Sequence, residues 1–291
     1  MLYSELFASA LGKLDHGEMA TAVEVLIARA FRLSRTGFWI AKNQPVRDAA
    51  GLRRFRRALK RLLAGEPLAY ILGEKEFFGK TFAVSPAVLV PRPETELLVE
   101  RALAILGRTP AASAETMPRR GGARVLDIGA GSGCIAITLA LHAPVEVTAL
   151  ELSRPALRML KRNIDRFGLR HRVHPMAGDL FPARPAVFQM IVANPPYLSR
   201  RHWRQAPREV RLHEPQEALV AGPAGTEMLE RIIARAPLWL ESGGCLLLEI
   251  GQGQRRALRG LLQAAGLREV ECVQDYAGID RVVVAQKNDL S

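Results

Sequence analysis

Cysteine is scarce in this chain, with three residues among 291, and Cys134, Cys245 and Cys272 lie far apart. They form neither a CxxC pair nor a spacing with histidine that is typical of zinc ligands, so the sequence predicts no disulfide and no structural zinc. The six histidines are scattered in the same way, and we assign no metal to them. A reducing, cytoplasmic setting is the expectation that follows.

Long apolar runs are also missing. No stretch of about 18 apolar residues without charge occurs, so no membrane span is expected. Residues 1–5 lack a basic region followed by an apolar one, so we expect no signal peptide. With 48% hydrophobic and 24% charged residues, the composition is that of a globular protein with a sizeable core.

Acidic residues are outnumbered, and the net charge is +12. Residues 1–75 carry 13 Lys or Arg against 7 Asp or Glu, which is half of that excess, so the charge is spread rather than gathered in a tail. A basic surface favours nucleic acid, or a partner that lies near nucleic acid. A solvated, arginine-rich surface explains the same charge equally well.

Residues 1–72 are expected to be helical, because apolar residues recur at helical spacing in two stretches. These residues are Ala20, Val23, Leu26, Ile27 and Ala30, then Leu52, Phe55, Leu59 and Leu62. Arg35-Thr36-Gly37 predicts a break between the helices. The second helix carries six basic residues, Arg53, Arg54, Arg56, Arg57, Lys60 and Arg61, which indicate either a contact with nucleic acid or a partner, or the solvated side of a bundle.

The periodicity changes after residue 75. Residues 76–90 combine aromatic and β-branched residues with breaks at Gly79-Lys80 and Ser85-Pro86, which predicts a β-hairpin. Pro91-Arg92-Pro93-Glu94-Thr95-Glu96 then begins a helix with acids in its first turn. Residues 107–122 are rich in small and turn-forming residues and predict a surface loop.

From residue 123 onward, strands and helices alternate, which indicates an α/β fold with a doubly wound, mostly parallel sheet. The expected strands are 124–128, 145–150, 172–175, 188–193, 245–250, 269–273 and 282–285. The expected helices are 135–141, 155–167, 226–236 and 254–265. Residues 198–225 are expected to form a long loop that borders a substrate channel.

A glycine-rich turn joins the first of these strands to its helix: Asp127-Ile128-Gly129-Ala130-Gly131-Ser132-Gly133. Its glycines allow a tight turn and close approach to a ligand, and helix amides then face that ligand. Asp127 is placed to receive an ammonium group. Glu151, at the end of the second strand, is placed to accept both hydroxyls of a ribose. Asp179, after the third strand, is placed to reach an adenine amino group. The alternatives are a solvated loop carboxylate for Glu151 and a turn residue for Asp179.

A second turn, Asn194-Pro195-Pro196-Tyr197, closes the apolar strand 188–193. The Asn194 amide and the Pro195 carbonyl offer acceptors for the two hydrogens of a planar –NH2 group, and Tyr197 offers a flat ring. A plain proline turn that closes a buried strand is the alternative. In a doubly wound sheet, ligands bind beyond the carboxyl ends of the strands at the switch in strand order. The two turns are therefore expected to face each other across one pocket.

These residues resemble known families. The segment from Asp127 to Gly133 with Glu151 resembles class I S-adenosylmethionine-dependent methyltransferases, and the Asn194 turn resembles those that act on amino nitrogens. Over roughly residues 60–285, the chain is similar to the peptide chain release factor glutamine methyltransferases, the HemK/PrmC family. The further stretches that carry this resemblance are Gly65-Glu66-Pro67-Leu68-Ala69-Tyr70, Pro91 to Glu96, Glu214-Pro215 with Ala218-Leu219, Glu249-Ile250-Gly251 with Gln254, and Asp275 to Gly278 with Asp280 and Arg281.

The resemblance implies a Rossmann-like class I methyltransferase with a mostly parallel seven-stranded sheet and a small N-terminal all-helical domain. It implies a helical bundle at residues 1–75 that recognises the release factor, a β-hairpin linker at 76–92 and a methyltransferase domain at 93–291. The implied reaction moves a methyl group from S-adenosylmethionine to the side-chain amide of the glutamine in the Gly-Gly-Gln motif of class I release factors. We expect a cytoplasmic monomer that requires neither a membrane nor nucleic acid.

The resemblance also assigns site residues. Catalysis is implied for Asn194, Pro195 and Tyr197, and substrate binding for these three and Pro196. Cofactor binding is implied for Asp127, Gly129, Ala130, Gly131, Ser132, Gly133, Glu151, Asp179, Leu180 and Asn194. The chain departs from the family pattern at Gln189, where an acid is common, at Glu151, where Asp is usual, and at Pro223, which replaces a glycine.

Three other functions remain open at this point. A sister family methylates glutamine in a ribosomal protein and shares the Asn194 turn, but departs at Glu94-Thr95-Glu96. A nucleic-acid methyltransferase acting on adenine or guanine amino groups uses the same turn, but must flip its base from a duplex. A non-catalytic binding module that keeps the fold is the third alternative.

Overall fold

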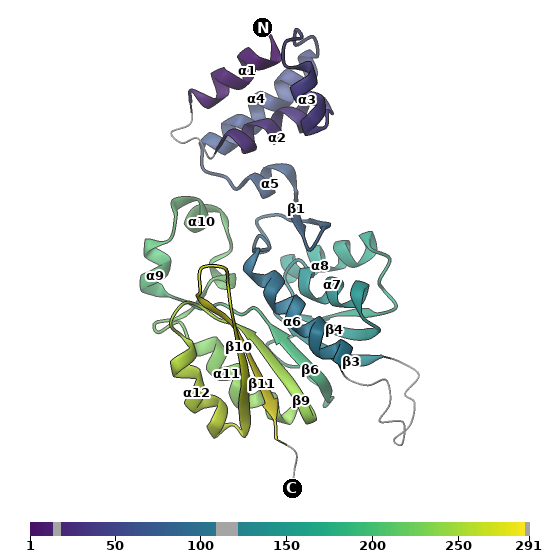
Figure 1. Ribbon diagram of the computed structural model, residues 1–291, viewed down its shortest axis with the longest axis vertical. Helices are drawn as coiled ribbons and strands as arrows, with labels where there is room; N and C mark the ends of the chain where they lie inside the picture. Colours follow the sequence, from purple (N-terminus) through teal and green to yellow (C-terminus); the bar gives the residue numbers. More distant parts are fainter. Residues whose placement is uncertain (14–18, 109–121, 289–291) are drawn as a thin grey trace. The chain divides into compact units, whose positions relative to one another are not determined.

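A computed structural model of the chain describes residues 1–13, 19–108 and 122–288 (Figure 1). Two compact units are present. The first comprises Met1–Glu74 with Pro207–His213, and the second comprises Lys75–Ala206 with Glu214–Ser291. The expected division at residues 1–75, 76–92 and 93–291 stays a prediction. Most of the loop expected at 107–122 lies outside the described residues.

The first unit is helical, with α1 (Tyr3–Leu11), α2 (Ala20–Phe31), α3 (Arg35–Ala41), α4 (Ala49–Leu63), α5 (Leu68–Leu72) and α10 (Arg208–His213). Its core contains the apolar residues that predicted the helices, among them Leu26, Ile27 and Phe55, together with Phe38. Asp48 caps α4, because its Oδ1 accepts a hydrogen bond from the Gly51 amide at 2.8 Å.

The break expected at Arg35-Thr36-Gly37 is wrong by a few residues. The chain leaves α2 at Arg32, which has a positive φ of 58°, and α3 begins at Arg35. Ser34 caps α3 by accepting a hydrogen bond from the Gly37 amide at 2.9 Å, so this glycine lies in the first helical turn.

The basic residues of α4 fall into two groups. Arg54 and Arg61 bond within the unit: Arg54 contacts Asp48, and Arg61 donates to the two carboxylate oxygens of Glu66 through Nε and Nη2. The Arg61 guanidinium holds the pKa of Glu66 below its usual value. The other four, Arg53, Arg56, Arg57 and Lys60, are exposed.

The second unit is built on a mixed sheet of seven strands among the described residues: β3 (Ala123–Ile128), β4 (Val145–Glu151), β5 (Val173–Ala177), β6 (Phe188–Ala193), β9 (Leu240–Glu249), β10 (Leu267–Gln274) and β11 (Asp280–Lys287). The strand order is β10-β11-β9-β6-β3-β4-β5. The pairs from β9 to β5 are parallel, whereas β11 is antiparallel to both of its neighbours. This order confirms the expected mostly parallel seven-stranded sheet.

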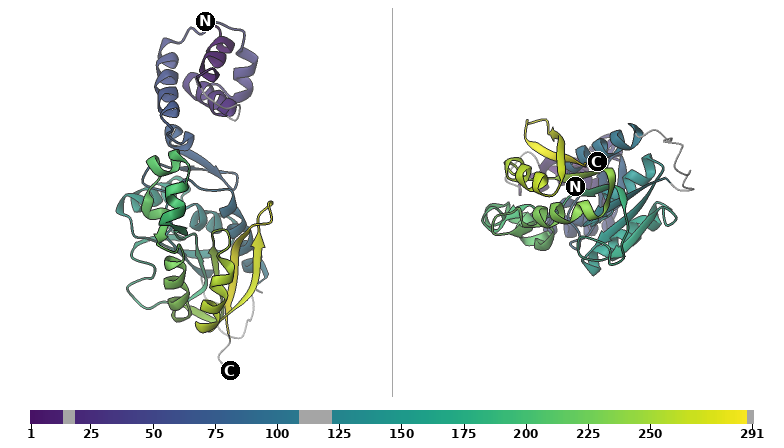
Figure 2. Two further views of the ribbon diagram at one scale, coloured as in Figure 1. Left: turned by 90° about the vertical axis from the view of Figure 1, so that its left-hand side faces the viewer. Right: turned by 90° about the horizontal axis from the view of Figure 1, so that it is seen from below.

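Helices cover both faces of this sheet (Figures 1 and 2). On one face, α6 (Glu94–Arg108), α7 (Cys134–His142) and α8 (Arg154–Arg166) pack over a core that includes Leu98 and Leu160. On the other face, α11 (Glu227–Arg235) and α12 (Arg255–Ala264) pack over a second core that includes Ile232 and Leu258. Successive side chains of a strand point to opposite faces of the sheet, so Val125 packs in the first core and Leu126 in the second.

The expected hairpin is present but shorter than predicted. It consists of β1 (Glu74–Phe77) and β2 (Lys80–Ala83), turning at Phe78 and Gly79, which both have positive φ. Residues 84–90 form no strand. Phe77 and Phe82 enter the core beneath α6, α7 and α8.

Asn163 of α8 joins this hairpin to the glycine-rich turn. Its Oδ1 accepts a hydrogen bond from the Ala83 amide at 2.8 Å. Its Nδ2 donates to the carbonyls of Ala83 at 2.9 Å and Ser132 at 2.8 Å. Asn163 is completely buried, so its loss would leave three backbone groups without a partner away from water.

We therefore expect Asn163→Ala to lower the free energy of unfolding by about 3 to 5 kcal/mol. The matched control is Arg162→Ala, an exposed neighbour on the same helix, which should change stability by less than about 0.5 kcal/mol. Urea denaturation of both variants measures the difference. A loss below about 1 kcal/mol for Asn163→Ala would contradict this account of the hairpin.

The long loop expected at residues 198–225 is wrong. The segment holds β7 (Leu198–Ser199), α9 (Arg200–Gln205), α10, a 3-10 turn (Gln216–Ala218) and β8 (Val220–Gly222), and β7 pairs with β8. Its helices are short and have no buried residues, so they show no apolar periodicity. Ser199 instead initiates α9 by accepting a hydrogen bond from the His202 amide at 3.1 Å.

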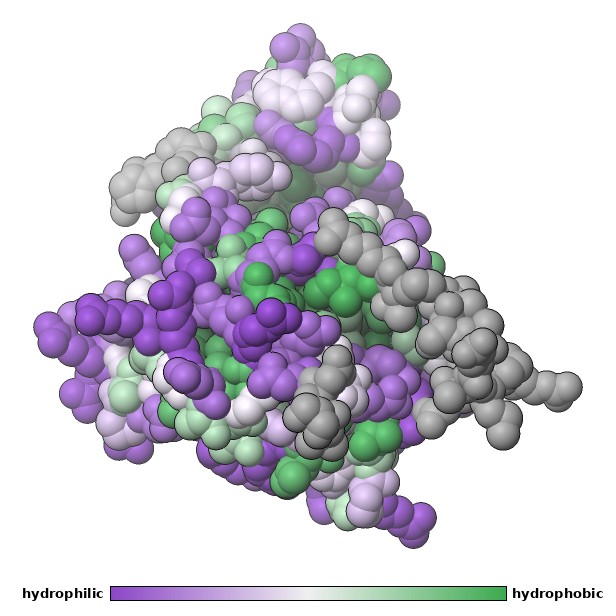
Figure 3. Space-filling model, turned by 60° about the horizontal axis from the view of Figure 1, so that its bottom comes forward, coloured by the Kyte–Doolittle hydropathy of each residue, from purple (hydrophilic) through white to green (hydrophobic). Residues whose placement is uncertain are grey.

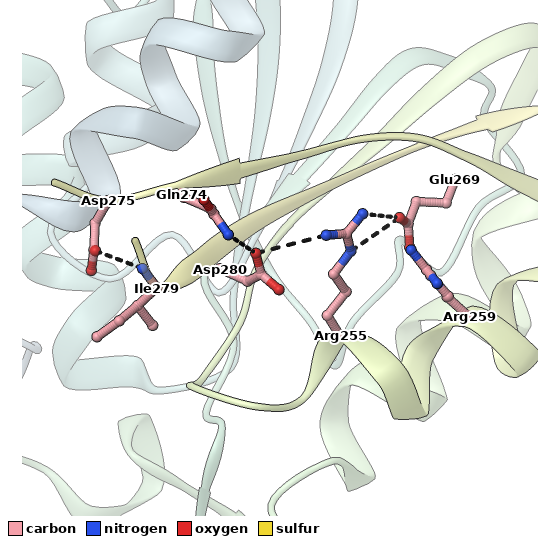
Figure 4. A network of polar contacts seen from close by, with 7 residues as sticks. All are labelled: Arg255, Arg259, Glu269, Gln274, Asp275, Ile279 and Asp280. Atoms are coloured by element: carbon pink, nitrogen blue, oxygen red, sulfur yellow. Dashed lines mark hydrogen bonds and ion pairs between the residues drawn. The ribbon is translucent and has the colours of Figure 1, made fainter. Parts of the chain in front are cut away.

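Charged residues connect α12 to the C-terminal strands (Figure 4). Arg255 lies between Glu269 at 2.8 Å and Asp280 at 3.7 Å, and Arg259 contacts Glu269 from the next helical turn. At the turn between β10 and β11, Asp275 Oδ1 accepts hydrogen bonds from the Ala277 and Ile279 amides. These contacts fix the geometry of the turn.

The face in Figure 3 is covered largely by hydrophilic side chains, with apolar residues in small patches among them. Within residues 1–13, 19–108 and 122–288, no helix combines the length and apolar character needed to cross a membrane.

Candidate active site

The glycine-rich turn connects β3 to α7. Gly129, Gly131 and Gly133 all have positive φ, at 73°, 56° and 83°, which residues with a Cβ adopt at a cost. At Gly133 a Cβ would also lie 2.5 Å from Leu160 Cδ1. Gly133 is therefore required for packing against α8, whereas a Cβ on Gly129 would meet no atom within 4 Å.

Backbone and carboxylate groups at the end of β4 hold this turn in place. The amides of Gly129 and Ala130 both donate to the Leu150 carbonyl at 2.9 Å. Glu151 is buried, and its two oxygens accept hydrogen bonds from the Gly131 and Ser153 amides, each at 2.8 Å. Each carboxylate oxygen can accept a second hydrogen bond, so Glu151 retains the capacity for two ribose hydroxyls.

Asp127 is completely buried at the end of β3. Its Oδ2 accepts a hydrogen bond from the Ala136 amide at 3.1 Å, while no donor in the described part of the chain reaches Oδ1. Burial raises the pKa of the Asp127 carboxyl to about 7, the Ala136 amide opposes this shift, and the charge of Glu151 adds to it. A cation nearby would favour the ionised form.

This pKa predicts a dependence of stability on pH. A folded-state pKa above the unfolded value means that the folded protein binds the extra proton, so the corresponding stabilisation is lost as pH rises from about 4 to 7. Asp127→Asn removes this titration. The difference in free energy of unfolding between Asp127→Asn and wild type should therefore move by about 2 kcal/mol in favour of the variant as the pH rises from 5 to 8. Urea denaturation at the two pH values tests this, and a difference that does not change with pH would contradict it.

Asp179 and Leu180 follow β5. Asp179 is about half exposed and forms an ion pair with Arg231 of α11 at 2.6 Å. Leu180 is buried and has a positive φ of 62°, which is strained for a residue with a side chain. Such strain is typical of ligand-binding segments, although it does not identify the ligand.

The Asn194 turn lies beside the glycine-rich turn, as expected. β3 and β6 are parallel neighbours, with Ile128 opposite Ala193 in register. Asn194 Nδ2 donates a hydrogen bond to Thr95 Oγ1 of α6 at 3.0 Å. The amide nitrogen is thus occupied, and Asn194 Oδ1 is the polar atom left for a ligand.

Tyr197 lies at the edge of this arrangement. A Cβ on Gly251 would lie 3.1 Å from Tyr197 Cδ2, so the tyrosine ring packs against the chain just after β9. Its carbonyl accepts a hydrogen bond from Gln254 Nε2 at 2.9 Å. Burial raises the pKa of the Tyr197 hydroxyl to about 12, with Glu249 adding to the shift, so the hydroxyl is neutral at physiological pH.

Residues of both turns line one cavity of about 400 Å³. Of the expected site residues, those that line it are Gly129, Ala130, Gly131, Ser132, Glu151, Asp179, Leu180, Asn194, Pro195 and Pro196. Three expected residues, Asp127, Gly133 and Tyr197, are not among its lining residues. Their predicted roles stay predictions.

The lining of the cavity includes segments distant in sequence, with Pro91, Arg92 and Thr95 from one segment and Pro215, Glu217 and Ala218 from another. A partly buried ion pair joins these segments, with Arg92 and Glu214 2.6 Å apart. Glu96 is not a lining residue, and its Oε1 accepts a hydrogen bond from the Phe78 amide at 2.8 Å.

Comparison with known proteins decides the family. The PrmC N-terminal domain model matches residues 5–73, and the methyltransferase small domain model matches residues 110–224. A release factor glutamine methyltransferase of Bordetella pertussis is 42% identical over 86% of this chain and 89% of that protein. One from Nitratidesulfovibrio vulgaris is 39% identical, covering 92% and 88%. The chain belongs to the release factor glutamine methyltransferases.

Solved structures agree with the fold of this family. A methyltransferase from Pyrococcus furiosus superimposes with a TM-score of 0.53 at 19% identity, over 80% of this chain and 98% of that one. A Thermus thermophilus 16S rRNA methyltransferase in complex with AdoMet and guanosine gives a TM-score of 0.51 at 20% identity, over 74% and 50%. The class I methyltransferase fold is confirmed. At these identities the likeness establishes the fold alone.

The site of this methyltransferase fits the expected cofactor, S-adenosylmethionine. The glycine-rich turn leaves room for a ligand close to its backbone, Glu151 has free acceptor capacity, and Asp127 Oδ1 is a buried acceptor without a donor in the described residues. Cys134 lines the same cavity, but burial raises the pKa of its thiol to about 12, so it is no nucleophile.

Sequence reasoning missed two residues of the site. Thr95 and Glu249 bond to each other and connect to Asn194, and both are buried. Both fall in stretches that resemble the family, yet the sequence by itself predicts no role for either. An acid at the end of a buried strand was the available signal, since an isolated charge there requires a partner.

Proposed function

We propose that this protein transfers a methyl group from S-adenosylmethionine to the side-chain amide nitrogen of the glutamine in the Gly-Gly-Gln motif of class I peptide chain release factors. Membership of the family supports this substrate. The observation that carries the proposal is the position of Asn194 and Pro195, which lie beside the glycine-rich turn in one cavity.

Asn194 and Pro195 hold the substrate amide. Asn194 Oδ1 and the Pro195 carbonyl accept its two hydrogens, which stops rotation of the amide and increases electron density on nitrogen. An amide nitrogen is otherwise a poor nucleophile, because its lone pair is delocalised into the carbonyl. Alignment of the reacting atoms supplies most of the acceleration. Pro196 lines the cavity beside them. Tyr197, whose ring packs beside Gly251, is proposed to cover the plane of the amide once the substrate is bound.

Residues of the glycine-rich turn and of the segments at the ends of β4 and β5 would hold the methyl donor. S-adenosylmethionine, when bound, would supply an electrophilic methyl group from its sulfonium, whose sulfur would leave as a neutral thioether. The methylated amide nitrogen would then release one of its two protons. Glu151 would accept the ribose hydroxyls, Asp179 and Leu180 would border the adenine, and Asp127 would support the ammonium end. Gly129 to Gly133 keep the backbone close to the ligand, for the steric reasons given above.

The helical unit is proposed to engage the release factor. Within residues 1–75, the exposed basic residues of α4 offer a charged surface for that contact. Because release factors act at the ribosome, we expect the enzyme in the cytoplasm, and we expect it to act as a monomer without nucleic acid.

The test combines purified protein, S-adenosylmethionine and an unmodified class I release factor. Peptide mass spectrometry should find one added methyl group on the glutamine of the Gly-Gly-Gln motif. A methyl group on a ribosomal protein or on RNA, with none on the release factor, would contradict the proposed substrate.

A further inference from the structure

A buried carboxyl group, that of Glu249, is connected to Asn194 through one hydroxyl, and the Asn194 side chain also acts on it directly by a hydrogen bond that lowers its pKa. Glu249 ends β9, and β6 and β9 are paired with Ala193 opposite Leu248, so Asn194 and Glu249 are the next residues in register. Thr95 Oγ1 donates a hydrogen bond to Glu249 Oε2 at 2.7 Å and accepts one from Asn194 Nδ2 at 3.0 Å. Thr95 and Glu249 are 2% and 1% exposed, so bulk solvent competes little for these hydrogen bonds.

The direction of these hydrogen bonds follows from the number of protons. A hydroxyl has one proton, and an ionised carboxylate can only accept, so the Thr95 proton points to Glu249. The Thr95 oxygen then offers only lone pairs to Asn194, which must present its NH2 group. Asn194 Oδ1 is thereby turned toward the cavity, where a substrate amide needs an acceptor.

We propose that Thr95 and Glu249 are positioning residues, which fix the side-chain amide of Asn194 so that its oxygen faces the substrate amide. This inference rests on the proposed function, because it explains the orientation of Asn194, the residue proposed to bind the substrate amide. Glu249 supplies a fixed hydrogen-bond acceptor. Thr95 donates to Glu249 and accepts from Asn194, and these two hydrogen bonds set which end of the Asn194 amide faces the cavity.

The arrangement depends on the ionised form of Glu249. A protonated Glu249 can donate to Thr95, whose own proton is then free to donate to Asn194 Oδ1, and the amide loses its fixed orientation. Burial raises the pKa of the Glu249 carboxyl to about 7. The hydrogen bonds with Thr95 and Asn194 and the charge of Arg281 lower this pKa, whereas the charge of Glu94 raises it further. The other ionisable groups affected by the Glu249 charge are those of Tyr197 and Cys134.

The test measures methylation of an unmodified release factor by wild type, Thr95→Val, Thr95→Ser and Glu249→Gln. Thr95→Val keeps the shape of the side chain without its hydroxyl and should lower kcat about 10- to 100-fold, with the Kd for S-adenosylmethionine within about threefold of wild type. Thr95→Ser restores the hydroxyl and should bring kcat back to within about threefold. At saturating S-adenosylmethionine, wild-type kcat should rise with pH through about 7. The rise should be smaller in Glu249→Gln, which lacks this carboxyl while Asp127 still titrates in the same range.

A second readout does not depend on the substrate. In protein labelled with 15N at asparagine, the Asn194 side-chain resonances, assigned by their loss in Asn194→Gln, should shift with pH near 7 in wild type and stay constant in Glu249→Gln. Constant resonances in wild type would overturn the inference. So would wild-type kcat in Thr95→Val, or a Thr95→Ser as slow as Thr95→Val. Absence of methylation by wild type would instead contradict the proposed function, and the resonances would still decide the orientation.

Discussion

Asn194→Ala is expected to lower kcat about 1000-fold while the Kd for S-adenosylmethionine stays within about threefold of wild type. The loss is large because Asn194 Oδ1 is one of two acceptors for the substrate amide and its position is fixed by Thr95. The cofactor is expected to contact mainly the other turn of the cavity, which the substitution leaves intact. Single-turnover methylation of a release factor measures kcat, and calorimetry measures the Kd.

The matched control for this prediction is Asn288→Ala, the same change at an exposed residue after β11. It should leave both quantities at their wild-type values. Equal losses in kcat and cofactor affinity for Asn194→Ala would contradict the separate roles assigned to the two turns, since Asn194 would then contribute to both ligands alike.

Glu151→Ala is expected to have the largest effect on the cofactor, raising the Kd for S-adenosylmethionine about 100-fold. The substitution removes two proposed acceptors for ribose hydroxyls and also frees the Gly131 and Ser153 amides, which Glu151 now holds at 2.8 Å. At saturating cofactor, kcat should fall much less, because Asn194 and Pro195 are unchanged.

Glu146→Ala is the control for Glu151, because Glu146 is an exposed glutamate on the same strand. Its Kd for S-adenosylmethionine should equal that of wild type. A Glu151→Ala protein that is folded by circular dichroism and binds the cofactor with wild-type affinity would remove Glu151 from the site.

The parts of the fold that follow from local patterns were predictable. Strand 188–193 was placed at its observed bounds because a continuous apolar run followed by two prolines has few other solutions. Its position beside β3 followed from the usual strand order of doubly wound sheets, and the two turns meet in one cavity as that order requires.

The remaining features depend on contacts between residues far apart in the chain. Thr95 and Glu249 are separated by 154 positions, so no local pattern shows that their side chains meet. The ion pair of Asp179 with Arg231 spans 52 positions. The short helices within 198–225 have no apolar periodicity, and a capping serine such as Ser199 is too common to predict them by itself.

The contacts of Asn163 also bear on the order in which the site is completed during synthesis. Ala83, Ser132, Glu151, Leu160 and Asn163, which support the glycine-rich turn, all precede residue 167. Asn194 and Glu249 come later in the chain. In a polypeptide that leaves the ribosome from its N-terminus, the half of the cavity assigned to the methyl donor therefore has its supporting residues available before the half that holds the glutamine is made.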